Sequence, residues 1–125
     1  MTVWRIMGDK ILVIDDEKNI GELIQLAMQA KGYRVEYATT GRGGFDMFGK
    51  FAPDLVLIDK RLPDMDGVEV ARRIREAEPG KKTPLMLMTG DVSEQGIDKT
   101  LFVAAIEKPI SMARLSVLVD QTIRH

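Results

Sequence analysis

The sequence predicts an α/β protein in which a mostly parallel β-sheet lies between two layers of helices. Short apolar runs without polar alternation occur along the chain, a pattern typical of strands that are buried on both faces. Longer stretches with apolar side chains at helical spacing separate these runs. The alternation of strand and helix occurs five times within 125 residues, and right-handed crossovers between parallel strands then favour a doubly wound three-layer sandwich.

The first part of the chain is predicted to form two strands joined by a helix. Residues 11–14 read Ile-Leu-Val-Ile, a β-rich apolar run, and residues 34–37 form a second short strand. Residues 19–31 place apolar side chains on one helical face. Asn19 is the predicted N-cap of this helix, and Gly32 is expected to end it in the left-handed conformation.

Three glycines follow the second strand, at positions 41, 43 and 44. They resemble a phosphate-binding loop only loosely, because no fully apolar strand precedes them and no Gly-Lys-Ser/Thr sequence follows. We therefore predict a turn at these glycines and a weak helix around residues 44–51.

The second part of the chain repeats the pattern. Apolar runs predict three further strands, at residues 55–58, 85–88 and 103–106. Residues 68–76 form a predicted helix whose outward face carries three solvated arginines, namely Arg72, Arg73 and Arg75. Pro79-Gly80 is expected to stop this helix, and Ser111 begins the last one. The stretch between the last two strands has two glycines and few apolar residues, so we expect its helix, the fourth, to be short or irregular.

Composition excludes several classes of site. The chain has no cysteine and its only histidine is His125, which excludes disulfides, zinc–thiolate sites, a Ser-His-Asp triad and a phosphohistidine step within this chain. A net charge of −1 gives no indication of DNA binding or of an anionic membrane partner. Residues 1–8 form a lead-in without a signal-peptide pattern, and the apolar runs are too short to cross a bilayer. We therefore expect a cytoplasmic protein with one domain over residues 9–124.

Polar residues of useful chemistry follow four of the five predicted strands. Asp15 and Asp16 follow the first, Asp59 the third and Thr89 the fourth, and Lys108 comes two residues after the fifth. Because the carboxyl ends of parallel strands share one edge of the sheet, these side chains are expected to meet in one crevice. Any one of these polar residues could serve only as a helix N-cap, but N-capping is a much less probable explanation for all of them together.

This convergence predicts a metal and phosphoryl site. Three neighbouring carboxylates repel one another unless a cation is present, and Mg²⁺ with oxygen ligands suits them best. A lysine and a threonine that face the same point suit an incoming phosphoryl group. One aspartate is then available as a nucleophile that forms an acyl phosphate.

Four motifs occur in register with a known family. They are Ile-Leu-Val-Ile-Asp-Asp-Glu at residues 11–17, Leu-Val-Leu-Ile-Asp-Lys-Arg-Leu-Pro-Asp-Met-Asp-Gly at 55–67, Leu-Met-Thr at 87–89 and Glu-Lys-Pro at 107–109. Together they resemble the CheY-like receiver domain of two-component response regulators, over about residues 9–124. The resemblance implies a flavodoxin-like fold with strand order 2-1-3-4-5, and a signalling domain rather than an enzyme.

The resemblance also implies a role for each matching residue. Asp59 matches the phosphoacceptor, which takes a phosphoryl group from a histidine kinase or a histidine phosphotransfer protein. Asp16 matches the direct Mg²⁺ ligand, Asp15 matches a carboxylate that acts through a metal-bound water, and Arg61 supplies a backbone carbonyl to the metal.

The remaining matches concern the phosphoryl group and the switch. Thr89 matches the switch hydroxyl and Lys108 the lysine that pairs with the phosphoryl group, with the Gly90 amide expected to bind it too. The Lys108–Pro109 bond matches a peptide bond that is usually cis. Pro63 and Gly67 match the turn into the next helix.

Two departures from the family lie on the face that usually reports phosphorylation. Ala105 stands where the family often has an aromatic residue, and the nearest aromatic side chain is Phe102. The stretch between Thr89 and Lys108 is also about three residues shorter than in many relatives. The phosphorylation chemistry is therefore expected to be intact, whereas the way in which phosphorylation is transmitted to a partner is not predicted by the resemblance.

Two alternatives stay open at this stage. A pseudo-receiver would bind a partner without phosphorylation, although none of the acidic or lysine positions is lost here. A small Mg²⁺-dependent phosphohydrolase of the haloacid-dehalogenase type would need an aspartate two positions after its nucleophile, where Asp15 has Glu17 and Asp59 has Arg61. The expected partners are the kinase or phosphotransfer protein and a downstream protein, with the chain itself a monomer or weak dimer. A start at Met1 favours a stand-alone regulator over a receiver excised from a hybrid kinase.

Overall fold

A computed structural model describes residues 9–78, 82–93 and 97–123 of the chain. Five parallel strands form one sheet in the order β2-β1-β3-β4-β5, which confirms the predicted fold class and strand order. The strands are β1 (Lys10–Ile14), β2 (Arg34–Ala38), β3 (Leu55–Asp59), β4 (Leu85–Thr89) and β5 (Ala104–Glu107). The helices are α2 (Lys18–Gln29), α3 (Gly41–Phe51), α4 (Gly67–Ala77) and α5 (Met112–Ile123).

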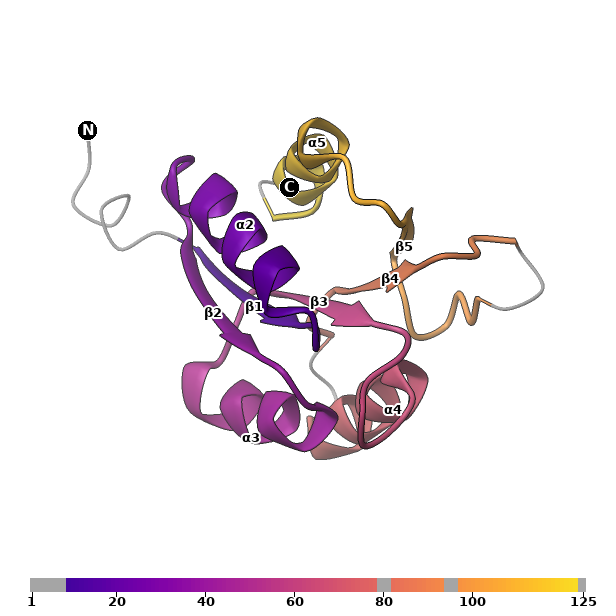
Figure 1. Cartoon of the computed structure of the whole chain (residues 1–125). Coiled ribbons are helices and arrows are strands. Elements are labelled where there is room, and N and C mark those ends of the chain that lie inside the picture. Colours follow the sequence, from indigo (N-terminus) through magenta and orange to yellow (C-terminus); the bar gives the residue numbers. More distant parts are fainter. Residues whose placement is uncertain (1–8, 79–81, 94–96, 124–125) are drawn as a thin grey trace.

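The sheet forms the middle layer of a sandwich. Helices α2 and α5 cover one face, and α3 and α4 cover the other, as Figure 1 shows. Alternate strand residues therefore enter two separate cores, one with Ile24 and Leu115 from α2 and α5, and one with Phe48 and Ile74 from α3 and α4. Strands β3 and β4 are buried along their whole length, as their unbroken apolar sequences predict. No helix in the described parts of the chain has the length and apolar character needed to cross a membrane.

The first helix begins before its predicted start. The predicted N-cap was Asn19, but the observed N-cap is Glu17, and Asn19 lies within the first turn of α2. The reason is a tight turn directly after β1, in which the Glu17 N–H donates to Asp15 Oδ1 over 2.8 Å. The predicted left-handed conformation of Gly32 is confirmed, with φ at +96°.

The three glycines after β2 begin a helix rather than forming a turn. The Thr40 hydroxyl caps α3 by accepting the Gly43 N–H over 2.9 Å. The Asp64 carboxylate accepts the N–H groups of Gly41 and Arg42, over 2.8 and 2.9 Å. Gly44 packs so closely on β1 that an added Cβ would lie 2.4 Å from a methyl group of Ile14. The prediction of a turn was wrong for two reasons. These glycines allow the helix to pack closely on its neighbours, and the Asp64 carboxylate that accepts the first N–H groups of the helix is distant in sequence.

One of the three arginines predicted to be solvated on helix α4 is not fully exposed. Arg72 and Arg73 are exposed, as predicted, but Arg75 is half-buried. Its guanidinium donates to the carbonyl of Thr83 over 2.8 Å and to the carbonyl of Leu101 over 3.2 Å. The α4 helix ends at Ala77, and the predicted stop at Pro79-Gly80 lies outside the described residues.

The connection between β4 and β5 contains no helix over residues 90–93 and 97–103. This agrees with the prediction that the fourth helix is short or irregular, and it corrects the count of helices from five to four in the part of the chain that the structure describes. The predicted cis bond at Lys108–Pro109 is present.

Candidate functional site

Four of the predicted site residues meet at the carboxyl edge of the sheet. Asp15 follows β1, Asp59 is the last residue of β3, Thr89 is the last residue of β4, and Lys108 follows β5. Strands β1 and β3 are neighbours although β2 lies between them in sequence, so the strand order reverses beside Asp15 and Asp59. Ligands of open α/β sheets bind at such a reversal.

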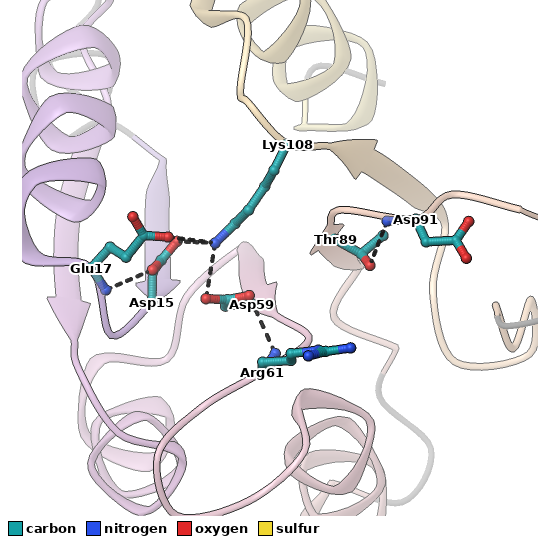
Figure 2. A network of polar contacts seen from close by, with 7 residues as sticks. All are labelled: Asp15, Glu17, Asp59, Arg61, Thr89, Asp91 and Lys108. Carbon is teal, nitrogen blue, oxygen red and sulfur yellow. Dashed lines mark hydrogen bonds and ion pairs between the residues drawn. The ribbon is translucent and has the colours of Figure 1, made fainter.

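Lys108 is the centre of this arrangement. Its ammonium donates to Asp59 Oδ2 over 3.0 Å and to Glu17 Oε1 over 3.3 Å, and it lies 3.4 Å from Asp15 Oδ2. Figure 2 shows the lysine reaching from the end of β5 toward the three carboxylates. Burial alone would lower the pKa of Lys108, but the bond to Asp59 and the charges of Asp15 and Asp59 raise it overall.

Asp15 is held in an unfavourable environment for its charge. The residue is completely buried, and burial raises the pKa of its carboxyl from 3.8 to about 6. The Glu17 N–H and the Lys108 ammonium oppose this rise, whereas the charge of Asp59 adds to it. Among the described residues Asp15 Oδ2 has no hydrogen-bond partner, and the Lys108 ammonium lies 3.4 Å from it as an ion pair. A buried carboxylate oxygen of this kind is a ready ligand for a cation.

The oxygen atoms around Asp15 suit a hard divalent cation. Carboxylate oxygens of Asp15, Glu17 and Asp59 lie within 4.8 Å of one another. Mg²⁺ prefers oxygen ligands and commonly takes one or two carboxylates, with water completing its shell. The donor set and the unbonded Asp15 oxygen therefore fit the ion that the sequence predicts. The group contains Glu17, whereas the predicted direct ligand Asp16 is exposed and is not part of it.

The loop after β3 presents the carboxylate of Asp59, a residue that is only 4% exposed. The Arg61 N–H donates to Asp59 Oδ1 over 3.3 Å, and the side chain of Arg61 is exposed. Gly67, the first residue of α4, packs against the Asp59 backbone, where an added Cβ would lie 2.1 Å from the carbonyl oxygen. Gly67 also donates its N–H to the Lys60 carbonyl over 2.7 Å, which closes the loop.

Thr89 lies beside the carboxylate–lysine group and is linked to the following loop (Figure 2). Its hydroxyl accepts the Asp91 N–H over 3.2 Å, and Asp91 Oδ1 accepts the Ser93 N–H over 2.8 Å. A hydroxyl that accepts one hydrogen bond keeps its own proton to donate, so Thr89 can bind a further oxygen while it holds Asp91. Gly90 is exposed between these residues.

The predicted switch position lies apart from this group. Ala105 is half-buried in β5 and packs against the core formed with α3 and α4. No bulky side chain at this position connects Thr89 with the surface.

Sequence reasoning missed two residues of the site. Glu17 was not assigned a role, although it follows the Asp15-Asp16 pair directly. The tight turn after β1 places its carboxylate beside the Lys108 ammonium. Asp91 was missed because its contact with Thr89 is made by the backbone, which no side-chain pattern reveals.

Comparisons with known proteins agree with this geometry. Residues 11–120 match the response regulator receiver domain family. The regulatory protein AtoC of Escherichia coli (strain K12) is 29% identical over 119 residues, which are 93% of this chain and 25% of that protein. The chain thus spans about a quarter of the length of this relative.

Solved structures show the same fold. The chemotaxis response regulator CheY4 of Vibrio cholerae is 25% identical, with a TM-score of 0.86 over 92% of this chain and 98% of that one. A CheY-like receiver domain protein from Methanospirillum hungatei JF-1 is 26% identical, with a TM-score of 0.85 over 94% of each chain.

Proposed function

The chain belongs to the response regulator receiver domain family, and on this premise we propose that it is a phosphoryl-accepting switch with Asp59 as the acceptor. The observation that carries the proposal is the ion pair between Lys108 and the buried Asp59, 3.0 Å apart, beside the unbonded oxygen of Asp15. A cation-binding acidic group and a lysine on one carboxylate are the charges that an incoming phosphoryl group requires.

The reaction is the transfer of a phosphoryl group from a phosphohistidine of a kinase or phosphotransfer protein. An Asp59 carboxylate oxygen attacks phosphorus, a P–O bond forms, and the P–N bond to the donor imidazole breaks. The imidazole nitrogen keeps the electron pair and takes a proton from solvent. The product is an acyl phosphate on Asp59. Its hydrolysis releases inorganic phosphate, restores the Asp59 carboxylate and resets the switch.

Mg²⁺ would be held by Asp59, by Asp16 directly, by Asp15 through a water and by the Arg61 carbonyl. When bound, it would neutralise the acidic group so that an anionic phosphodonor can approach. Support for Asp16 comes from the family likeness, whereas the proximity of Glu17 to Asp15 and Asp59 supports Glu17. Separate substitutions of Asp16 and Glu17 decide between the two.

Lys108 and Thr89 have different tasks in this scheme. The Lys108 ammonium balances the added charge on the phosphoryl oxygens, and its pair with Glu17 is the contact it can release at least cost, because Glu17 is 61% exposed. The Thr89 hydroxyl donates to a phosphoryl oxygen, with the Gly90 amide beside it. Because Thr89 already holds the Asp91 N–H, its movement would carry the loop after β4 toward the site. A downstream protein would read that loop.

Intact-protein mass spectrometry with acetyl phosphate tests the proposal. We expect one added phosphate in the presence of Mg²⁺ and none in EDTA or in Asp59→Asn. Asp46→Asn is the matched control, because Asp46 is an exposed acid on α3, and it should be phosphorylated like the parent. Absence of phosphate in the parent would favour a pseudo-receiver that binds without phosphorylation, and phosphate that persists in Asp59→Asn would contradict the assignment.

A further inference from the structure

Three carboxylates surround the Lys108 ammonium, and one of them differs from the other two. The ammonium donates to Asp59 Oδ2 and to Glu17 Oε1, and it lies 3.4 Å from Asp15 Oδ2. The side chains of Asp15 and Asp59 are 0% and 6% exposed, whereas the side chain of Glu17 is 61% exposed. Asp15 and Asp59 therefore lie inside the site, and Glu17 reaches the lysine from the solvent side.

The backbone of Glu17 is held at a fixed place. Its N–H donates to Asp15 Oδ1 over 2.8 Å, and its carbonyl accepts the N–H groups of Ile20 and Gly21 over 3.0 Å each. Glu17 is the N-cap residue of α2, but its carboxylate makes no cap bond to the helix. The carboxylate instead accepts a hydrogen bond from Lys108, 91 positions later in the sequence. The turn after β1 thus positions this carboxylate for the lysine.

Glu17 and the threonine of the site lie on different sides of the lysine. Figure 2 shows Glu17 and Thr89 on opposite sides of the Lys108 ammonium. The Lys108 N–H donates to the Thr89 carbonyl over 2.8 Å, so the backbone of the lysine is fixed to the end of β4. To bind a phosphoryl group that lies on Asp59 and beside Thr89, the lysine must therefore turn its side chain. The bond to Glu17 holds that side chain on the other side.

The phosphoryl group and Glu17 need the same donors. An ammonium has three N–H donors, and Asp59 and Glu17 accept two of them. Phosphorylation adds negative charge and three strong acceptor oxygens to the site. These oxygens require the donor that Glu17 takes in the metal-free protein, so uptake of a phosphoryl group has to break the bond between Lys108 and Glu17.

We propose that Glu17 is a positioning residue that holds the Lys108 ammonium away from the phosphoryl position and so weakens the binding of a phosphoryl group at Asp59. Glu17 acts through Lys108 and touches no reacting atom itself. Once released, its exposed carboxylate is solvated by water, so the contact is weak enough to be displaced. The inference rests on the proposed function, because it assigns Glu17 a part in the same reaction.

Beryllofluoride, a stable mimic of the phosphoryl group, allows this effect to be measured as a binding constant. The ¹⁹F NMR signal of the bound mimic reports the occupied fraction in a titration. The Mg²⁺ affinity of each variant is measured first by calorimetry. Each titration with beryllofluoride then uses a free Mg²⁺ concentration far above the dissociation constant of that variant, so differences in metal binding do not enter the comparison.

Two substitutions separate the contact of Glu17 with Lys108 from its charge. Glu17→Gln removes the charge and keeps the length of the side chain. Glu17→Asp keeps the charge, but its carboxylate is one methylene shorter, and aspartate at an N-cap accepts N–H groups of its own helix. We expect both variants to bind beryllofluoride about threefold more tightly than the parent, the upper part of the range for an exposed ion pair. A purely structural role of Glu17 would instead give weaker binding in both.

Glu22→Gln is the matched control. Glu22 is an exposed glutamate on α2, and its carboxylate lies 3.8 Å from the ammonium of Lys18. Its replacement removes the same charge from the same helix and breaks the same kind of ion pair, but with a different lysine. We expect Glu22→Gln to bind beryllofluoride with the affinity of the parent. A general effect of acidic charge on α2 would tighten binding in this variant as well, and would contradict the inference.

Three other outcomes would overturn the inference. Equal or weaker binding of beryllofluoride by Glu17→Gln would show that Glu17 does not restrain Lys108, and a loss of Mg²⁺ affinity of at least about tenfold in the same variant would then identify Glu17 as a metal ligand. A gain in Glu17→Gln that is absent in Glu17→Asp would show repulsion by the charge alone. Failure of the parent to bind beryllofluoride would contradict the proposed function as well, whereas a parent that is phosphorylated at Asp59 while neither Glu17 variant gains affinity would contradict only the role of Glu17.

Discussion

Replacement of the buried carboxylate of Asp15 by an amide should stabilise the metal-free protein. Asp15→Asn removes a charge that burial disfavours, and the amide oxygen can still accept the Glu17 N–H. A rise of the carboxyl pKa from 3.8 to about 6 corresponds to about 3 kcal/mol of penalty for the ionised form. Lys108 loses its ion pair with Asp15 in the variant but keeps those with Asp59 and Glu17, so its charge still has two carboxylate partners.

The gain should depend on pH in a definite direction. Because the pKa of Asp15 is higher in the folded state, folding is favoured by protonation of this group, and that contribution is lost as the pH rises from 3.8 through about 6. The variant should therefore exceed the parent by about 3 kcal/mol in free energy of unfolding at pH 7.5, and by under about 1 kcal/mol at pH 4. Urea unfolding in EDTA, followed by circular dichroism, measures both differences.

Mg²⁺ should largely cancel this difference. Free Mg²⁺ at 100 times its dissociation constant should stabilise the parent by about 2.7 kcal/mol, and Asp15→Asn by much less. Asp46→Asn, an exposed acid on α3, is the control and should follow the parent at each pH. Equal or lower stability of Asp15→Asn than of the parent at pH 7.5 in EDTA would show that the buried charge of Asp15 does not destabilise the metal-free protein.

Three further predictions concern the metal, the packing and the loop. Asp16→Ala should weaken Mg²⁺ binding, measured by calorimetry, at least about tenfold, because even the loss of a residue that only hydrogen-bonds a metal ligand has an effect of this size. Lys108→Ala should keep the metal site and impair phosphoryl binding. Equal Mg²⁺ affinity of Asp16→Ala and the parent would point to Glu17 instead. Gly44→Ala should destabilise the protein by about 1–3 kcal/mol, because its Cβ would meet a β1 side chain at 2.4 Å. Gly49→Ala, where a Cβ meets nothing within 4 Å, should stabilise it by about 0.5–1 kcal/mol in the same denaturation assay, and the reverse order would contradict the packing argument. Hydrogen exchange with and without beryllofluoride should change most in residues 89–93 and 97–101, and a change confined to α5 would contradict a switch through this loop.

Local sequence was sufficient to predict the strands and the edge where Asp15, Asp59, Thr89 and Lys108 lie. Fully apolar strands are recognisable without tertiary information, and parallel strands place their carboxyl ends together. The start of α3 was not predictable in this way, because the Asp64 carboxylate that accepts the first N–H groups lies more than twenty residues away.

Other misses have the same origin. Arg75 reads as one more exposed arginine on α4, and only the path of the later chain brings the Leu101 carbonyl to it. Glu17 follows two aspartates in sequence, but its contact with Lys108 spans 91 positions. Local patterns thus predicted Asp15, Asp59 and Lys108 at this edge, whereas the long-range path of the chain decided that Glu17 joins them.

Chemical trapping of the acyl phosphate is the most direct test of phosphorylation at Asp59. After incubation with acetyl phosphate and Mg²⁺, borohydride reduces an aspartyl phosphate to homoserine, and tandem mass spectrometry locates the modified residue. We expect homoserine at Asp59 alone, and none there when EDTA replaces Mg²⁺. Homoserine at Asp15 or Asp16 in its place, or an unmodified Asp59 in the presence of both reagents, would contradict it.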